Sequence, residues 1–381
     1  MNLEAVRTSA ETRSEWIRAS LRDLVCQESP SEDRAAVNAA VAMVEAHARA
    51  LGGRIRRHRQ KSFGDILELR FGPTRSPRKP ILLLGHLDTV WPMGTLKTMP
   101  WREENKEDGR FYGPGVLDMK AGVIMALAAI DILRELKLSR PVVLLLNSDE
   151  EVGSDVSRPI TEKLARECSA VFVLEPAQGL AYKTARKGVG QYNVQITGVA
   201  AHSGVDFERG HSAILEMAKL IQKISGFTDL SLGRTVNCGV ISGGTRSNVI
   251  AQSAAVEVDV RIARASDAAR VEKLFRSLKP SDPNCKVHIT GGINRPPMER
   301  KAGTIALFKQ AHKLAAALGF DLPEASTGGG SDGNFTAALG IPTLDGMGAI
   351  GEGAHAAHEH IVSKHLVPRT ALLAAMLASV N

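Results

Sequence analysis

Short apolar runs alternate with helical segments along the first half of the chain. The runs Ile81–Leu84, Val142–Leu146 and Val171–Leu174 contain only aliphatic or aromatic residues, and a glycine or a polar residue follows each. Such runs are typical of strands buried on both faces of a parallel sheet. Between them, Lys120–Leu136 places apolar residues on one helical face, and Asp155–Arg166 is a second predicted helix. This order predicts a mainly parallel α/β sheet flanked by helices.

Elements of the same kind precede and follow this region. We predict a helix over Arg13–Leu24 and another that starts after the capping sequence Pro30–Asp33 and ends before Gly52–Gly53. Two strands come next, and the C-terminal part continues with a helix, a strand and a final helix. In chain order these ranges are Arg54–Arg59, Asp65–Phe71, Gly303–Leu318, Ile341–Leu344 and Val367–Leu377.

A different pattern begins after Tyr182. Val189–Thr197 alternates apolar and polar residues, as a strand with one solvated face does. The elements from this strand onward follow the order β-α-β-β-α-β, which is typical of the ferredoxin-like fold. They are the helix His211–Ile224, the strands Thr235–Ile241 and Ala254–Ile262, the helix Ser266–Leu278 and the strand Cys285–Thr290. We therefore predict a smaller α+β domain over residues 184–296, inserted into a larger domain formed by residues 1–183 and 297–381.

Length and charge agree with two globular domains and argue against a nucleic-acid partner. A chain of 381 residues is too long for a typical single core. The formal net charge of +7 would attract anionic substrates. The densest basic cluster, Arg54–Lys61, has no accompanying set of aromatic residues, and basic residues elsewhere are interleaved with acids. We interpret this cluster as a solvated strand or edge.

The cysteines and the N-terminal sequence indicate a reducing compartment. The four cysteines are scattered and form no CxxC pair, which argues against a disulfide framework and against a thiolate zinc site. The first residues contain no apolar signal core, and no apolar segment approaches the length of a membrane span. We expect a cytoplasmic protein without a membrane partner.

Two polar residues follow the first buried strand at once. His86 and Asp88 lie just beyond the carboxyl end of Ile81–Leu84, where functional groups of parallel sheets are found. Because they are two residues apart in extended chain, they point to the same side, and the Asp88 carboxylate can accept the ring N–H of a metal-binding imidazole. A hydrogen-bonded structural histidine is the alternative.

Four further stretches place acids or histidines at strand ends or in glycine-rich loops. Asp118 follows a loop of small residues and precedes a helix, where it could also face the helix dipole. Asp149, Glu150 and Glu151 follow Val142–Leu146, and three adjacent acids are costly there unless a cation offsets them; a solvated acidic turn is the alternative. The remaining candidates are Glu175 after the third strand, and His355, His358 and His360 before the last helix.

Together these residues predict a metal centre. Two imidazoles and three or four carboxylates lie beyond strand ends on one side of one sheet. This mixture suits Zn²⁺ or its close neighbours, whereas Mg²⁺ and Ca²⁺ prefer oxygen ligands alone. The number of ligands is sufficient for two metals about 3.5–4 Å apart that share one carboxylate.

The motifs GHLDTV, GPGVLDMKAG, SDEEVGS, GVAAHSG and GGGSDG occur in an order that identifies a resemblance. The chain resembles, over essentially its whole length, the dizinc metallopeptidase family of glutamate carboxypeptidases, aminoacylases, acetylornithine deacetylases and succinyl-diaminopimelate desuccinylases. The similarity is strongest to the glutamate carboxypeptidase branch. The resemblance implies two bound Zn²⁺ ions, with Co²⁺ or Mn²⁺ as alternatives, and an inserted domain that serves as a lid and as the homodimer interface.

The resemblance also implies a role for each candidate in the larger domain. His86 and Glu175 would bind one metal, Glu151 and a C-terminal histidine the other, and Asp118 would bridge them. Of the three histidines, His355 fits best, because Gly353-Ala354 precedes it and Glu359 stands where the family has an acid. Glu150 would be the general base and Asp88 would orient His86. The family often has a cis peptide after the bridging Asp, here Asp118–Met119.

For the smaller domain the resemblance implies substrate contacts. His202 resembles a histidine that reaches into the partner subunit's site and polarises the scissile carbonyl. Asn248, Arg261 and Arg295 resemble residues that bind the substrate carboxylate and the tetrahedral oxygens. Gly329, within the glycine run, resembles a loop whose backbone N–H groups face the substrate carboxylate. Arg261 could instead end a strand in solvent, Asn248 could be a turn residue, and the glycine run could be a plain tight turn.

The implied reaction is hydrolysis of an amide that joins an acyl or peptidyl group to an amino acid with a free carboxylate. The alternatives within the family are an N-acyl-amino-acid deacetylase and an aminopeptidase. In the family, Glu at the position of Glu175 accompanies carboxypeptidases and deacylases, and Asp accompanies many aminopeptidases, so the aminopeptidase is the weaker alternative. A non-catalytic binding protein is disfavoured because the general base and every ligand are present.

Overall fold

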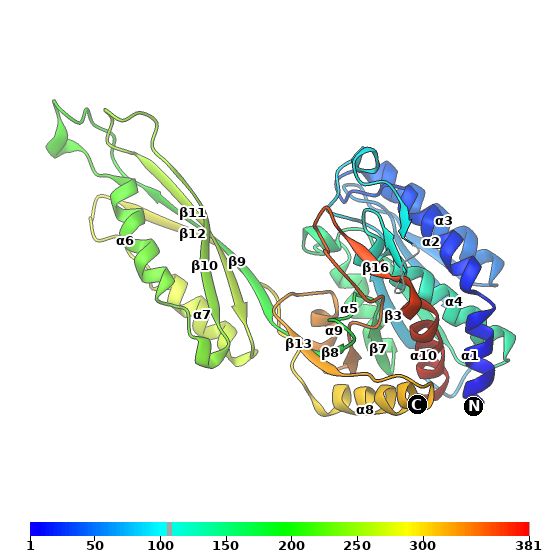
Figure 1. Cartoon of the computed structure of the whole chain (residues 1–381). Helices are drawn as coiled ribbons and strands as arrows, with labels where there is room; N and C mark the ends of the chain where they lie inside the picture. The colour runs from blue at the N-terminus through cyan, green and yellow to red at the C-terminus, as the bar shows by residue number, and fades with distance from the viewer. Residues whose placement is uncertain (105–108, 381) are drawn as a thin grey trace. The chain divides into compact units, whose positions relative to one another are not determined.

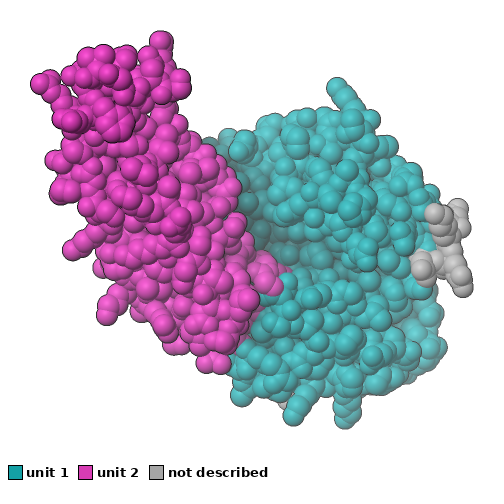
Figure 2. Space-filling view, turned by 60° about the vertical axis from the view of Figure 1, so that its left-hand side comes forward, with its two compact units in different colours: residues 1–185, 300–327, 331–381 teal, residues 186–299, 328–330 magenta. Residues whose placement is uncertain are grey.

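The computed structural model describes residues 1–104 and 109–380. Within these ranges it contains no helix that is both long and apolar enough to cross a membrane. The chain divides into two compact units, coloured separately in Figure 2. Unit 1 comprises residues 1–185, 300–327 and 331–381, and unit 2 comprises residues 186–299 and 328–330.

Unit 1 is built on a six-stranded sheet with the order β1-β2-β6-β3-β7-β14. β6, β3, β7 and β14 are parallel, and β1 and β2 extend the sheet antiparallel at one side. The predicted mainly parallel sheet is therefore confirmed. The strands span Arg54–His58 (β1), Ile66–Phe71 (β2), Ile81–His86 (β3), Val142–Asn147 (β6), Ala170–Val173 (β7) and Thr343–Leu344 (β14).

Two hydrophobic layers cover this sheet, because its central strands are apolar on both faces. Leu83 and Leu144 pack into the larger core with most of the helices, whereas Leu82 and Leu145 pack into a smaller core with Leu164. Figure 1 shows helices on both sides of the sheet. The larger layer contains α1 (Leu3–Glu11), α2 (Ser14–Cys26), α3 (Arg34–Ala50), α4 (Ala121–Glu135), α8 (Ala302–Ala317) and α10 (Leu366–Ser379), and the smaller one contains α5 (Arg158–Glu167) and α9 (Gly333–Ala338).

The N-terminal helices differ from the prediction at one point. The predicted helix Arg13–Leu24 corresponds to α2, but α1 precedes it and was not predicted. Val6 and Ala10 are buried and four residues apart, so this segment does carry a helical apolar pattern, although a short one; the Asn2 side chain caps the helix by accepting two backbone N–H groups. The Asp33 side chain caps α3 in the same way, whereas the sequence was interpreted as an N-cap followed by first-turn acids.

Two small sheets connect the C-terminal loops to the rest of unit 1. One has the order β15-β16-β5-β4 and joins the segment around the three histidines to the segment before Asp118. The other pairs β8 with β13. Their strands have two to five residues each, too few for an apolar period, and were not predicted. They are β4 (Arg102–Glu104), β5 (Arg110–Tyr112), β8 (Tyr182–Arg186), β13 (Glu324–Thr327), β15 (Gly351–Glu352) and β16 (His360–Val362).

Unit 2 is an antiparallel sheet of four strands in the order β10-β11-β9-β12, with two helices, α6 and α7. Their order along the chain is the predicted β-α-β-β-α-β. The stacked rings of Tyr192 and Phe275, with centroids 3.8 Å apart, lie in a core between sheet and helices. The elements are β9 (Gly188–Thr197), α6 (Ala213–Ser225), β10 (Thr235–Gly243), β11 (Ser253–Ile262), α7 (Ser266–Arg276) and β12 (Lys286–Arg295).

Candidate metal centre and active site

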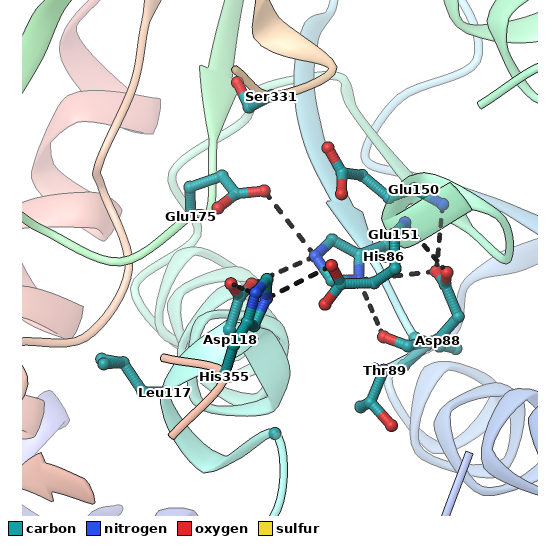
Figure 3. Close-up of polar contacts among 12 residues, drawn as sticks. His86, Asp88, Thr89, Leu117, Asp118, Glu150, Glu151, Glu175, Ser331 and His355 are labelled. Atoms are coloured by element: carbon teal, nitrogen blue, oxygen red, sulfur yellow. Dashed lines mark hydrogen bonds and ion pairs between the residues drawn. The ribbon is translucent and has the colours of Figure 1, made fainter. Parts of the chain in front are cut away.

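Adjacent parallel strands deliver three of the candidates to one edge of the sheet. His86 is the last residue of β3, the turn Glu150–Val152 follows β6, and Glu175 follows β7. Asp118 lies in the turn Val116–Lys120 before α4, and His355 in the loop between β15 and β16. Figure 3 shows these side chains converging although they come from five separate segments.

The converging side chains form two triads of candidate metal ligands that share Asp118. One triad is His86, Asp118 and Glu175; the other is Asp118, Glu151 and His355. Asp118 Oδ1 lies 3.2 Å from His86 Nε2, and Oδ2 lies 3.4 Å from His355 Nε2. Glu175 Oε1 is 3.6 Å from His86 Nε2, and Glu151 Oε2 is 3.3 Å from His355 Nε2. Each oxygen of Asp118 thus faces a different imidazole.

This geometry fits a pair of divalent cations. Nitrogen and oxygen ligands at zinc bond lengths, in a tetrahedral shell, are about 3.3–3.4 Å from one another, which is close to the four distances above. Charge-assisted N–H···O bonds are shorter, about 2.7–2.9 Å. In addition, Glu151 Oε1 is buried and has no hydrogen-bond partner among residues 1–104 and 109–380, a state that a cation would relieve.

The pKa shifts of His355, His86 and Glu151 show that the carboxylates of this site attract positive charge. The Asp118 and Glu151 carboxylates raise the pKa of His355 to about 10. Burial lowers the pKa of His86, but Asp118 and Asp88 outweigh it, and the pKa is raised well above its usual range. Burial raises the pKa of Glu151. Protons on the imidazoles and a cation between the ligands are therefore alternatives for balancing this charge.

Asp88 contacts the site in a different way from the one predicted. His86 Nδ1 lies 2.9 Å from the backbone carbonyl oxygen of Asp88, whereas the nearer carboxylate oxygen is 3.5 Å away. The predicted carboxylate–imidazole hydrogen bond is thus replaced by one to the main chain, because the chain turns after His86. The Asp88 carboxylate instead accepts the Ser31 hydroxyl and the backbone N–H groups of Glu150 and Glu151. Asp88 therefore fixes both the imidazole and the acidic turn.

Glu359 is a functional candidate to which the sequence analysis gave no role beyond its place after His355. Its carboxylate is buried and accepts backbone N–H groups from Gly115, Leu117 and Asp118 at 2.9–3.0 Å, and the indole N–H of Trp91 at 2.8 Å. Burial raises the pKa of Glu359, and these donors oppose that shift. The carboxylate therefore ties the loop of the shared ligand to the loop of His355.

We expect Glu359→Gln to weaken metal binding by about 10–100-fold, the usual cost of removing a group that orients a metal ligand. The amide presents one acceptor oxygen to donors that now meet two, so at least one buried N–H loses its partner. Competition with a chromogenic chelator would measure both affinities. Glu352→Gln, in the strand β15 that precedes this loop, is the control. Equal affinities for Glu359→Gln and the wild type would contradict this role.

The three C-terminal histidines have different surroundings. His355 points to Asp118 and Glu151 and has a left-handed backbone with φ of 62°, a conformation that non-glycine residues adopt mainly at special sites. His360 is buried, packs against the Tyr112 ring and lies 2.9 Å through Nδ1 from the His358 carbonyl oxygen. His358 belongs to neither triad. This geometry supports the choice of His355.

Arg369 holds the loop that is hydrogen-bonded to the Glu175 backbone. The sequence analysis did not name it. It is a fully buried residue of α10, and its guanidinium donates to the carbonyl oxygens of Gly348 at 2.9 Å and Gly346 at 2.7 Å. The backbone N–H of Gly348 in turn donates to the Glu175 carbonyl oxygen at 2.9 Å. A Cβ on Gly348 would lie 2.2 Å from the Leu174 carbonyl oxygen. A single arginine in an otherwise apolar helix was the available signal.

In unit 2, His202 and Asn248 lie together. His202 and Val249 form a β-bridge, and the Asn248 carbonyl oxygen accepts the Ser203 N–H at 3.1 Å. His202 Nδ1 accepts the Gly204 N–H at 3.1 Å. Because Nδ1 is the acceptor, the neutral ring carries its proton on Nε2, which is then a donor.

The other three candidates of unit 2 meet at the glycine run. The Arg261 guanidinium pairs with Asp259 at 2.8 Å and donates to the Gly328 carbonyl oxygen at 3.4 Å. Arg295 is buried, and its Cδ would lie 3.0 Å from a Cβ on Gly330. The buried Arg186, which the sequence analysis did not name, donates to the carbonyl oxygens of Gly329 and Gly330 at 3.3 and 3.0 Å.

Comparison with known proteins agrees with this geometry. Residues 82–379 match the profile described as peptidase family M20/M25/M40. Carboxypeptidase G2 of Pseudomonas sp. (strain RS-16) is 30% identical over 369 residues, which cover 94% of this chain and 87% of that protein.

Solved structures share the fold at lower identity. Aminopeptidase PepT from Bacillus cereus superposes with a TM-score of 0.79 at 22% identity, covering 96% of this chain and 98% of that one. A dinuclear metal-binding peptidase of the M20 family from Bacillus subtilis gives 0.70 at 15% identity, covering 97% and 98%. Given the matched profile, the whole-length relative and two ligand triads around one carboxylate, this chain belongs to peptidase family M20/M25/M40 and is a metallohydrolase.

Proposed function

We propose that the protein hydrolyses an amide bond whose amine-side product is an amino acid with a free carboxylate, as a glutamate carboxypeptidase does. The observation that carries this proposal is the pair of triads sharing Asp118, with Glu150 in the same turn as the ligand Glu151. The similarity to carboxypeptidase G2 over nearly the whole chain favours this substrate class. Glu175, where the family also has Asp, favours a carboxypeptidase or deacylase over an aminopeptidase.

The five ligands would bind two divalent cations, and the donor set of two imidazoles and three carboxylates favours Zn²⁺, with Co²⁺ or Mn²⁺ as alternatives. When bound, such ions polarise a carbonyl oxygen and bring the pKa of a water to about 7. Glu359 and Asp88 orient the ligands, and Arg369 supports the Glu175 segment from behind.

Glu150 is the proposed general base. It takes a proton from the attacking water and passes it to the leaving amine. Its backbone N–H donates to Asp88 Oδ1 at 3.3 Å, which fixes the turn, and its charge contributes to the raised pKa of His86, so the carboxylate is close to the first triad. In Figure 3 its side chain extends away from Asp88. This placement supports proton transfer beside the ligands without binding a cation itself.

Unit 2 is the proposed lid. His202, with a donor at Nε2, would hydrogen-bond to the scissile carbonyl oxygen in the partner subunit's site, and Asn248 would contact the tetrahedral oxygens. Arg261 and Arg295, beside the glycine run, would bind the substrate carboxylate. The half-buried Arg261 is already paired with Asp259, which orients its guanidinium.

A substrate panel tests this assignment. Zinc-loaded enzyme should release glutamate, or another amino acid with a free carboxylate, from N-acyl and dipeptide substrates, and substrates with an amidated C-terminus should lose most of their kcat/KM. Treatment with a chelator should abolish release, and added Zn²⁺ should restore it. Equal cleavage of amidated substrates would instead favour the aminopeptidase, and cleavage limited to short acyl groups would favour the deacetylase.

We also propose that the protein is a homodimer through unit 2. β10 is an edge strand, and Val240 and Ile241 on it are 57% and 62% exposed. On α6, Ile214 and Leu215 are 47% and 59% exposed. An apolar edge strand beside an apolar helix surface is unusual in a monomer and suits pairing with a second copy.

Ile241→Lys is expected to convert the dimer to a monomer, because it places a charge in the paired edge. Size-exclusion chromatography with light scattering would measure this: the wild type should have twice the chain mass of 40.8 kDa, and the variant the chain mass. Met93→Lys, which charges an exposed apolar residue of unit 1, should remain dimeric. A wild type of one chain mass at micromolar concentration would contradict the proposal.

We retain the cytoplasm as the proposed compartment. All four cysteines, Cys26, Cys168, Cys238 and Cys285, are free thiols in the structure. Free thiols agree with a reducing environment.

A further inference from the structure

A polar cavity of about 170 Å³ lies at the edge of the main sheet opposite the metal ligands. Pro80 and Pro141, which line it, immediately precede β3 and β6, whereas His86 and the acidic turn follow these strands. Its polar and charged lining residues are Arg54, Arg70, Thr74, Ser76 and Arg78.

The positive charge of this cavity is only partly balanced. Arg70 pairs with Glu68 at 2.6 Å and with Glu167 at 3.0 Å. Arg54 donates to the Gly72 carbonyl oxygen at 3.3 Å. Within residues 1–104 and 109–380, neither Arg54 nor Arg78 has an ion pair. Two of the three guanidinium groups are therefore available to an anion.

A buried arginine, Arg140, is linked by hydrogen bonds to the residues that line this cavity. Arg140 is only 2% exposed, and its Nη2 donates to Ser169 Oγ at 3.1 Å. Its Nε and Nη1 are buried and have no hydrogen-bond partner in the described part of the chain. The Ser169 N–H donates to the carbonyl oxygen of Pro80, a lining residue. Arg140 itself lines a neighbouring cavity and is linked to this one through Ser169 and Pro80.

In the part of the chain that the structure describes, Arg140 forms no ion pair with a carboxylate. Burial lowers its pKa, and the next largest effect is the charge of Arg78, which lowers the pKa further. A buried cation is costly unless a counter-charge is near. Here the largest effect of another charged group on Arg140 comes from a second cation, Arg78, and is followed by the opposing effect of Cys168. An anion in the cavity that Arg78 lines would offset the positive charge of both arginines.

We propose that this cavity binds a small multivalent oxyanion of the phosphate class. Arg54 and Arg78 would form the charge-assisted hydrogen bonds. Ser76 Oγ accepts the Arg78 N–H at 3.1 Å, which leaves its own hydroxyl proton to donate to the anion. Arg140 would add an unscreened positive charge from the interior. The anion would thus fasten the loop at residues 73–80 to the sheet and stabilise the fold, independently of the hydrolase activity.

The test is the thermal unfolding of the zinc-loaded protein, titrated with potassium phosphate at constant ionic strength set by KCl. The wild type should show a saturable rise in Tm. In Arg78→Gln the affinity derived from this rise should fall about tenfold or more, as expected for loss of a charge-assisted hydrogen bond, with unchanged turnover. A parallel titration with adenosine monophosphate distinguishes free phosphate from a phosphate group on an organic molecule.

Arg56→Gln is the matched control, because Arg56 is an exposed residue of the same strand as Arg54 but does not line the cavity. It should bind phosphate as the wild type does. The proposal is overturned if KCl alone reproduces the rise in Tm, if Arg78→Gln responds as the wild type does, or if Arg56→Gln loses as much affinity as Arg78→Gln. If phosphate bound at the metal centre instead, Arg78→Gln would respond as the wild type does.

Discussion

Replacing Glu150 by Gln is expected to lower kcat by about 10³-fold or more while both cations stay bound, since a positioned general base contributes about 10²–10⁴-fold. The amide is nearly isosteric with the carboxylate but cannot take the proton of the attacking water. The Asp88 hydrogen bonds to the acidic turn come from backbone N–H groups, so they are unaffected by the side chain. KM should change little, because the loss falls on the transition state.

Steady-state kinetics, together with metal analysis by mass spectrometry, would measure this result. Glu32→Gln is the control, because Glu32 is exposed and this substitution also removes one negative charge. If Glu150→Gln keeps more than about a tenth of the wild-type kcat, another residue is the base. If it loses a cation together with activity, Glu150 is a ligand and the assignment of the acidic turn is wrong.

The second large effect concerns the shared carboxylate. Asp118→Ala is expected to remove both cations, whereas His355→Ala is expected to remove one. Asp118 belongs to both triads, and each of its oxygens faces a different imidazole. His355 belongs to one triad only, and the other keeps its three ligands.

After dialysis against metal-free buffer, elemental analysis should find about two cations per chain in the wild type, one in His355→Ala and none in Asp118→Ala. His358→Ala is the control, because it removes a neighbouring imidazole that belongs to neither triad. Equal metal content in Asp118→Ala and His355→Ala would show that the two sites do not share Asp118.

The sequence predicted the strands that carry the site well, because each strand is marked by a short apolar run that can be recognised locally. The apolar run of β3 ends at His86, and β6 and β7 end just before the acidic turn and Glu175. A parallel sheet brings such ends to one edge, so the convergence follows from the strand pattern alone. The four residues Pro30–Asp33 likewise predicted the start of α3, although the cap is Asp33 itself and no acid lies in the first turn.

The residues that were missed act through the backbone of distant segments. Glu359 accepts N–H groups more than 240 positions away in the chain, and Arg369 donates to carbonyl oxygens of the Gly346–Gly348 loop. Backbone groups have no sequence signature, so neither contact could be predicted. For the same reason, the sequence did not predict that His86 bonds to the backbone carbonyl oxygen of Asp88 and not to its carboxylate.

X-ray diffraction from crystals of the metal-loaded protein, measured on both sides of the zinc absorption edge, would test directly whether two cations share Asp118. We predict two anomalous peaks about 3.5–4 Å apart, one between His86 and Glu175 and one between Glu151 and His355, with one Asp118 oxygen on each. A single peak, or two peaks without Asp118 between them, would contradict the account.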